Sequence, residues 1–366
     1  METAVAQYPR IVSVTSAQPP FVVTQDDMLS FILKHFLGAE WESRRDLDAD
    51  VRRMRHLFAA SHVERRHFAI DVDNFYSQLH GTGERMAVYQ ASAYELARPA
   101  LEACFAQTSH LRTPSDVTDL FLVSCTGYAS PGLDISLSRD LGIARDTRRV
   151  VIGHMGCFGA MVGLRQALSA VRADPQATAL MLSVELTSLH YAPTDDIEVL
   201  TACALFSDAA GALMLTNTDE SSGPELVDTY CAADFGASDQ MSWTITDTGF
   251  AMSLSPRVPV TLRRNIGGVV DRLLTPHGLR PTDIKHWLVH PGGPSILEVI
   301  QQKFELSEEQ METSWRILRE HGNCSSATIL LILEDYLRSQ RTKPGEWGIM
   351  MAFGPGLTLE TALIRF

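Results

Sequence analysis

The chain has 366 residues, of which 45% are hydrophobic, enough to bury a large core in one domain or in two closely packed halves. Charged residues make up 20% and the formal net charge is −13, a balance that argues against extensive disorder and against nucleic acid or an anionic membrane as the main partner. No signal peptide begins the chain, no apolar stretch approaches the roughly 20 residues that span a bilayer, and the six cysteines lack zinc spacing, so we expect a cytoplasmic protein with free thiols and no metal.

The N-terminal part of the chain predicts one strand and several helices. Residues 10–20 fit a strand that ends at a proline pair, and Thr24 fits the cap of a helix of about 13 residues that stops near Gly38. Residues 40–70 are rich in Arg, Asp and Glu, and we expect a solvated helix and loop there. Residues 87–106 again follow a helical pattern.

From residue 120 onward, short apolar runs alternate with helical stretches, which is typical of a layered α/β fold. The expected strands are 120–124, 149–153, 178–184, 211–216, 286–289, 347–353 and 357–364, and the expected helices are 158–172, 260–274 and 325–338. In outline each half of the chain has a strand, a small-residue turn, a helix and two more strands, with a helical insertion in the second. We therefore expect two similar halves, 1–220 and 221–366, that share one interface.

Cys157 is the first candidate for chemistry. It lies in Gly153-His-Met-Gly-Cys-Phe-Gly, between a predicted strand and a predicted helix. A helix N-terminus favours a thiolate, and Gly156 and Gly159 permit a tight turn and close approach of a substrate. The alternative is a small buried hydrophobic residue, which is what most free cysteines are.

His290 and Asn323 stand at comparable places. His290 ends an apolar strand and opens Pro-Gly-Gly-Pro, where α/β folds place ligand-binding groups, although a strand-end histidine can simply bond a carbonyl. Asn323 precedes a predicted helix in His321-Gly-Asn-Cys-Ser-Ser and could simply be its N-cap.

Together these three residues suggest acyl chemistry. A thiolate can attack a thioester, and an imidazole and an amide can donate hydrogen bonds to a developing enolate oxygen. A papain-like hydrolase and a decarboxylating Claisen condensation both use such a trio. The papain-type sequence around the cysteine is absent here, which favours the condensation.

Four motifs in order resemble those of the type III polyketide synthases, the chalcone synthase-like enzymes, over residues 10–366. Gly156-Cys-Phe-Gly resembles the family's nucleophile turn, His290-Pro-Gly-Gly-Pro its histidine motif, and Gly322-Asn-Cys-Ser-Ser-Ala its asparagine motif. Phe353-Gly-Pro-Gly-Leu-Thr-Leu-Glu resembles its C-terminal loop, and the spacings of 133 residues from Cys157 to His290 and 33 from there to Asn323 also agree. The resemblance implies a homodimer with the five-layered αβαβα thiolase fold, which uses an acyl-CoA starter and malonyl-CoA and needs no cofactor.

The resemblance also assigns substrate-binding positions. Phe206 matches the gatekeeper aromatic between the CoA tunnel and the cavity, although it could simply pack in the core. Cys125 matches a cavity position that is a cysteine in some bacterial members. The remaining cavity positions are His190, Trp243, Met252, Ser325, Gly292 and Gly293; Met252 replaces an aromatic residue of plant members, and Trp243 replaces a small one and would narrow the pocket.

One departure concerns the cations that hold CoA. Arg53 and His56 fit the CoA-binding helix, but Ala60 stands where a lysine is expected. Arg52, Arg55, Arg65 and Arg66 could supply the charge instead, or these arginines could form a solvated helix face.

Two other functions remain open. A ketoacyl-ACP synthase III-like enzyme, which makes one condensation or joins two chains, shares the trio but usually has His-Gln-Ala-Asn where this chain has His290-Pro-Gly-Gly. A catalytically silent partner subunit would be expected to lose part of the trio, which is complete here.

Overall fold

The computed structural model describes residues 8–35, 47–192, 194, 196–217 and 223–366. Nine strands of these residues form one mixed sheet with the order β11-β12-β13-β8-β1-β7-β6-β4-β5. In chain order the strands are β1 (Arg10–Ala17), β4 (Asp119–Ser124), β5 (Arg148–Gly153), β6 (Thr178–Glu185), β7 (Ala209–Thr216), β8 (Glu225–Ala233), β11 (Ile284–Val289), β12 (Trp347–Gly354) and β13 (Thr358–Arg365).

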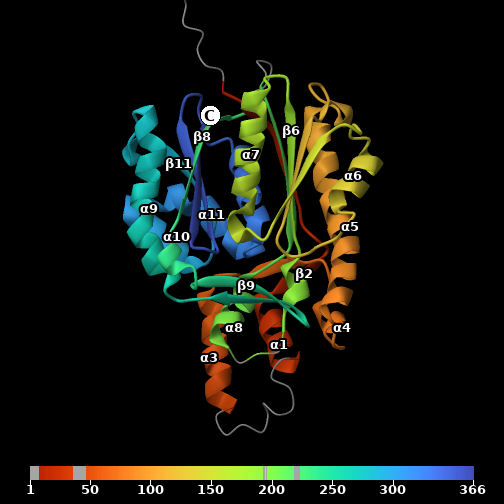
Figure 1. Cartoon of the computed structure of the whole chain (residues 1–366). Coiled ribbons are helices and arrows are strands. Elements are labelled where there is room, and N and C mark those ends of the chain that lie inside the picture. The colour runs from red at the N-terminus through yellow and green to blue at the C-terminus, as the bar shows by residue number, and fades with distance from the viewer. Residues whose placement is uncertain (1–7, 36–46, 193, 195, 218–222) are drawn as a thin grey trace, which may run out of the picture.

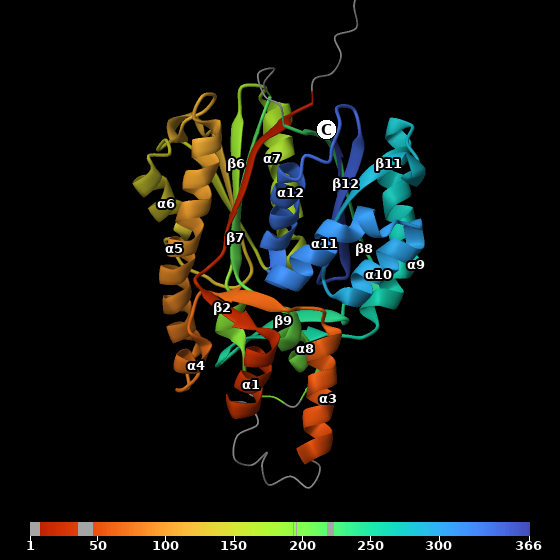
Figure 2. The same cartoon turned by 180° about the vertical axis from the view of Figure 1, so that it is seen from behind.

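The sheet consists of two parts that meet where β1 pairs with β8 at Arg10 and Glu225, whose side chains also form an ion pair of 2.7 Å. Figures 1 and 2 show the two parts facing each other across α7 (Gly159–Ala173) and α12 (Thr328–Arg338). Because α12 is covered from both sides, its sequence TILLILEDYLR is apolar over most of its surface.

Helices also cover the two outer faces. α5 (Thr82–Thr108) and α6 (Leu133–Leu141) lie outside one part of the sheet, and α9 (Val258–Leu274) and α10 (Pro294–Phe304) lie outside the other (Figure 1). The result is an αβαβα sandwich. α11 (Glu308–His321) connects α10 to the turn that precedes α12.

A smaller group of elements lies at one end of the sandwich (Figure 2). It contains the strand pairs β2 (Phe21–Thr24) with β3 (Arg65–Phe68) and β9 (Met241–Thr246) with β10 (Gly249–Leu254). Its helices are α1 (Gln25–His35), α3 (Leu47–Ala60), α4 (Val72–Phe75) and α8 (Ile197–Leu205).

Most of the predicted elements are confirmed, each with ends within a few residues of those observed. The backbone N–H of Asp27 donates to the Thr24 hydroxyl at 3.1 Å, as expected for a helix cap, whereas the predicted end near Gly38 lies outside the described residues. The expectation of a solvated helix and loop over 40–70 was wrong for its last part, because β3 is a strand and Arg66 is completely buried. Three strands that were not predicted, β8, β9 and β10, lie between the predicted strand 211–216 and the predicted helix 260–274.

Candidate active site

Cys157 lies in a 3₁₀ turn, Gly156–Phe158, that leads from β5 into α7. Gly156 has φ +73°, and a Cβ atom there would lie 2.5 Å from the Cδ atom of Pro355. Only glycine fits a left-handed position that another segment approaches so closely. The loop between β12 and β13 therefore packs directly on the turn that carries the thiol.

A buried hydrogen-bond network supports this turn from behind. The backbone N–H of Gly156 donates to Cys125 Sγ at 2.9 Å, and the backbone N–H of Cys125 donates to Glu185 Oε2 at 2.9 Å. The hydroxyls of Thr126 and Ser326 also donate to Glu185. Burial raises the pKa of Glu185 to about 7. Sequence reasoning missed this carboxyl, because it ends an apolar strand and belongs to no motif.

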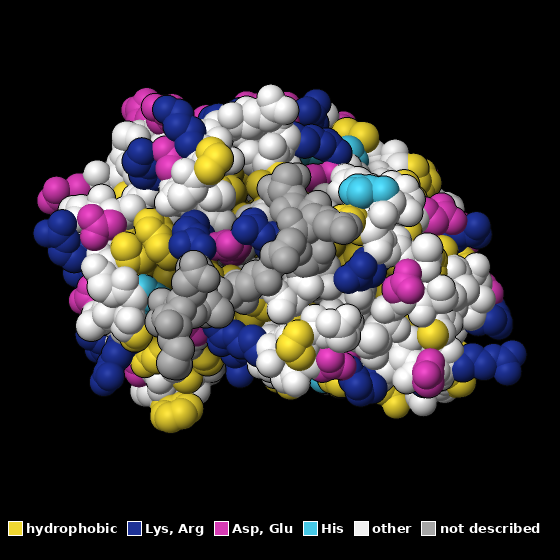
Figure 3. All heavy atoms as spheres, turned by 90° about the horizontal axis from the view of Figure 1, so that it is seen from above, with side chains coloured by type: hydrophobic (Ala, Val, Ile, Leu, Met, Phe, Trp, Pro, Cys, Tyr) yellow, Lys and Arg dark blue, Asp and Glu magenta, His cyan; other side chains and the backbone are white. Residues whose placement is uncertain are grey.

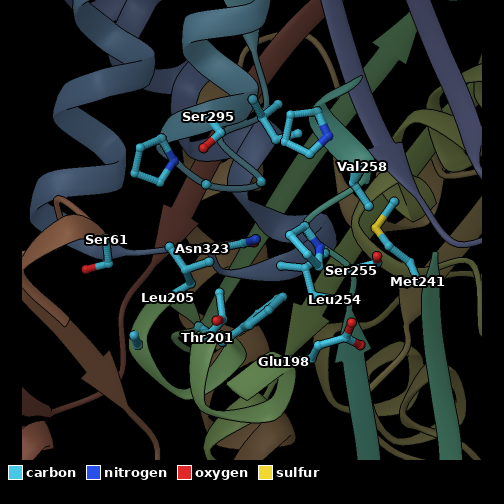
Figure 4. Close-up of a pocket in the computed structure, with 18 of the residues that line it drawn as sticks. Ser61, Glu198, Thr201, Leu205, Met241, Leu254, Ser255, Val258, Ser295 and Asn323 are labelled. Carbon is cyan, nitrogen blue, oxygen red and sulfur yellow. The ribbon is translucent and has the colours of Figure 1, made fainter. Parts of the chain in front are cut away.

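Asn323 is held by its backbone and by one side-chain oxygen. Its N–H donates to Leu205 O at 2.8 Å and its carbonyl accepts from Ser207 N–H at 2.9 Å, which places it beside Phe206. Its Oδ1 accepts from Ser325 N–H at 2.9 Å and lies 3.9 Å from Cys157 Sγ. Because the oxygen is committed in this way, the amide nitrogen points into the pocket (Figure 4).

His290 directly follows β11, and its backbone N–H donates to Met351 O on β12 at 2.9 Å. The side chain is completely buried, and neither ring nitrogen has a hydrogen-bond partner among the described residues. Burial lowers the pKa of His290 to about 3, so the imidazole is neutral. A buried polar group without a hydrogen-bond partner costs free energy. Such a group is expected where a bound substrate supplies the missing hydrogen bond.

A pocket of about 360 Å³ opens onto this site (Figure 4). Cys157, Asn323, Gly292 and Gly293 line it, whereas His290 does not and lies in the chain just before the two glycines. The other walls are mostly apolar and come from β9, β10, α8, the start of α9 and the end of α3. Their residues include Leu57, Ala60, Ser61, Thr201, Met241, Leu254 and Val258.

Behind Phe206 lies a second cavity of only about 30 Å³. Phe206 and Met252 line both cavities, and His190 and Trp243 line the small one, as does Phe250. His190 Nε2 donates to Thr126 O at 2.6 Å while its ring stacks on Phe250. The Trp243 indole N–H donates to Cys125 O at 2.7 Å. These rings, which their hydrogen bonds hold in place, occupy the space behind Phe206.

The structure thus brings most of the predicted site residues together: some line the cavities, and others lie beneath the nucleophile turn. Phe206, Met252, Gly292 and Gly293 line the main pocket. Cys125 lines neither cavity and lies beneath the nucleophile turn.

The thiol of Cys157 is held in its neutral form by its surroundings. Burial is the main cause that raises the pKa of Cys157 to about 12, and the charge of Glu185 adds to it. Hydrogen bonds with Ser325 and Asn323 act in the opposite direction. In the free protein, burial therefore outweighs the helix N-terminus, which the sequence predicted to favour a thiolate. A thiolate forms here only if a neighbouring group takes the proton.

Arg53 and His56 lie outside the pocket. Both are exposed on α3. They share one helix face with Leu57 and Ala60, because residues three, four and seven positions apart lie on the same face. Leu57 and Ala60 line the pocket, so this face leads to the pocket wall. Arg66 is buried instead, so it cannot be one of the solvated cations.

Two features are absent from the described residues. No group of three or more His, Cys, Asp or Glu side chains that could hold a metal occurs among them, and none of their helices is long and apolar enough to cross a membrane. Acidic and basic side chains are interspersed on the face shown in Figure 3.

Fold and site together define a thiolase-like condensing acyltransferase, and the comparisons agree. The family model described as "Chalcone and stilbene synthases, N-terminal domain" matches residues 4–219, and its C-terminal counterpart matches residues 234–366. The chain therefore belongs to the chalcone and stilbene synthase family, whose members are type III polyketide synthases.

Individual relatives are similar over almost the whole chain. A 1,3,6,8-tetrahydroxynaphthalene synthase of Streptomyces peucetius subsp. caesius is 32% identical over 97% of this chain and 93% of its own. A 3,5-dihydroxyphenylacetyl-CoA synthase of Streptomyces toyocaensis is 32% identical over 86% and 83%. The crystal structure of PKS-I of the brown alga Ectocarpus siliculosus superposes with a TM-score of 0.91 at 28% identity and covers 100% of both chains. The five-layered thiolase-like fold, the condensing activity and the family are thus confirmed.

Proposed function

We propose that this type III polyketide synthase uses Cys157 as its nucleophile and CoA thioesters as its substrates, with no cofactor. The thiol gives its proton to the neutral imidazole of His290, and the resulting thiolate attacks the thioester carbon of an acyl-CoA starter. The carbon–sulfur bond to CoA breaks, and the CoA thiolate leaves with that proton. The acyl group then remains on Cys157 as a new thioester.

In the second half-reaction malonyl-CoA occupies the same pocket. As its carboxylate leaves as carbon dioxide, the electron pair moves to the thioester oxygen, and His290 and Asn323 each donate one hydrogen bond to that enolate oxygen. The enolate carbon attacks the acyl carbon of the Cys157 thioester, the carbon–sulfur bond to Cys157 breaks, and the Cys157 thiolate leaves. The product is a β-keto chain on CoA, which the regenerated thiolate can take up again as in the first half-reaction. Repetition and ring closure yield a pyrone or a phenolic ring.

One observation carries this proposal: Cys157 and Asn323 share one pocket, while both nitrogens of buried His290 are without a partner among the described residues. A neutral imidazole has one N–H to donate, and the Asn323 amide has two, so both can serve the same oxygen. A silent subunit would have no use for these costly unpaired groups.

The other site residues act on chain length and substrate position. Phe206 and Met252 separate the main pocket from the small cavity, and Trp243 with His190 keeps that cavity closed, which favours short intermediates. Cys125 and Ser325 hold the turn and the thiol, and Gly292 and Gly293 allow the substrate to approach closely. Arg53 and His56 attract the phosphates of CoA at the end of α3.

We also propose a homodimer. β5 is the last strand of the sheet, and its Val150 and Val151 are exposed, as are the nearby Met155 and Tyr128. An exposed apolar edge strand is a hazard unless a partner covers it, and a second copy can pair with it antiparallel.

We place the border of the two halves at 1–220 and 221–366. We also place the protein in the cytoplasm, a reducing compartment, which suits the six free cysteines.

The test is product analysis of the purified protein with ¹³C-labelled malonyl-CoA and a panel of acyl-CoA starters, without carrier protein. We expect pyrones or aromatic rings that contain several labelled units. Cys157→Ala should abolish them, whereas Cys231→Ala, which removes an exposed thiol on β8, should not. A single condensation, or a strict need for a carrier protein, would instead indicate ketoacyl synthase chemistry.

A further inference from the structure

Arg66 is a buried cation that has no acidic partner in the part of the chain that the structure describes. It lies on β3 and is completely buried. Among the described residues its guanidinium group donates only to neutral oxygens: Nη1 to Cys203 O at 2.7 Å and Phe206 O at 3.1 Å, and Nη2 to Ala204 O at 2.7 Å and to the Gln25 side chain. A buried charge without a counter-charge is a poor way to gain stability, so another role is expected.

The three backbone acceptors of Arg66 lie at the C-terminal end of α8. Carbonyl groups there have no partner within the helix and carry the negative end of its dipole, which suits a cation. The next residue is Phe206, the side chain between the two cavities. Its carbonyl also accepts from the Tyr191 hydroxyl at 3.3 Å. Arg66 therefore holds the backbone of Phe206 in place.

The same end of α8 holds Asn323. Leu205 O and Ser207 N–H are the two backbone partners of Asn323, on either side of Phe206. Gly322 has φ +70°, and a Cβ atom there would lie 2.8 Å from Leu205 O and 3.8 Å from Arg66 Cβ. The segment that carries Asn323 therefore packs on the end of α8, which Arg66 holds in place.

Gln25 extends this arrangement to the mouth of the pocket. Its amide nitrogen donates to Phe58 O at 2.9 Å and to Ser61 Oγ at 2.6 Å, at the end of α3. Ser61 lines the pocket. Figure 2 shows α1, α3 and α8 close together at this end of the molecule.

We propose that Arg66 is a positioning residue for the condensation: it holds Phe206 and Asn323 in the geometry that enolate formation requires. The inference rests on the proposed function. Arg66 touches no reacting atom, so its removal should disturb malonyl-CoA decarboxylation, which depends on Asn323, more than the reactivity of the Cys157 thiol.

The test compares these two steps in Arg66→Gln, Arg66→Lys and wild-type protein. Decarboxylation is followed as acetyl-CoA formed from malonyl-CoA, and kcat is expressed per Cys157 thiol titrated with iodoacetamide, so that unfolded protein does not count. For Arg66→Gln we expect kcat to fall about 10- to 100-fold, the effect of a small misplacement, while the rate of Cys157 alkylation stays within about twofold. Arg66→Lys keeps the charge but not the fork of donors, so its kcat should be intermediate.

Arg112→Gln is the matched control. Arg112 is half-buried and also donates to neutral oxygens, those of Thr178 and Leu111, but it takes no part in the site, and its replacement should leave kcat unchanged. If Arg66→Gln does not fold, Gln25→Ala removes only one partner and should lower kcat less, in the same step.

The inference is overturned if kcat per thiol stays near the wild-type value in all Arg66 and Gln25 variants, or if decarboxylation and alkylation fall by the same factor. Failure of the proposed function would look different, since wild-type protein would then form no acetyl-CoA from malonyl-CoA.

Discussion

At the scale of single residues, the reactivity of Cys157 depends on where its proton goes. Burial raises the pKa of the thiol to about 12 and lowers that of the His290 imidazole to about 3. In the proposed mechanism, His290→Gln removes the base that takes the proton of the thiol. We therefore expect His290→Gln to slow iodoacetamide alkylation of Cys157 about 100-fold at pH 7, and to move the midpoint of its pH dependence upward.

Peptide mapping after alkylation would separate Cys157 from exposed Cys231. His286→Gln is the control, because His286 is a buried histidine of β11, the strand that His290 follows, and its ring bonds Glu346 and Tyr336. Equal midpoints in wild-type protein and His290→Gln would show that His290 does not take the proton.

Glu185 gives a prediction for stability. Its pKa rises from 4.5 to about 7 on folding because the carboxyl is buried, so the folded protein keeps a proton that the unfolded chain releases. Stability is therefore lost as the pH rises from about 4.5 to about 7, by at most about 3 kcal/mol. Glu185→Gln, which cannot ionise, should gain stability relative to wild type between pH 5 and pH 8, as measured by urea unfolding at both values.

The control for this prediction is Asp140→Asn. Hydrogen bonds from Arg139 and Tyr94 lower the pKa of Asp140 to about 2, so this exposed carboxyl is ionised at both pH values. The difference between Asp140→Asn and wild type should therefore not change between them. An equally flat difference for Glu185→Gln would mean that Glu185 is not protonated in the folded protein.

At the scale of elements, the β9–β10 pair controls the space behind Phe206. Trp243 on β9 lines a cavity of about 30 Å³ and is fixed by its hydrogen bond to Cys125 O. Trp243→Ala should enlarge this cavity several-fold, and mass spectrometry should then find longer polyketide chains or acceptance of bulkier starters. Trp315→Ala, in α11 and away from both cavities, should leave the products unchanged. An unchanged product set in Trp243→Ala would show that the cavity does not limit chain length.

The strands differ in how well the sequence could predict them. β4, β6 and β7 are buried along their whole length, so their apolar runs were readable, and the glycine-flanked motifs predicted where Cys157, His290 and Asn323 lie. Only the first residue of β9 and the first two of β10 are buried, and neither strand has such a run. Arg66 could not be predicted as buried, because most of its acceptors are backbone carbonyls at the end of α8, 137 to 140 residues away, and these leave no side-chain signal.

At the scale of the whole molecule, the exposed edge of β5 predicts the oligomeric state. Val151 is 58% exposed at the end of the sheet, and in a symmetric dimer any substitution in the interface occurs twice. Val151→Lys should place two positive charges in an apolar contact and convert the dimer to monomers, as judged by sedimentation velocity across a range of concentrations. Val260→Lys on α9 alters a valine that is 72% exposed elsewhere and should leave the dimer intact. A wild-type monomer, or a Val151→Lys protein that still sediments as a dimer, would show that the edge of β5 is covered in some other way.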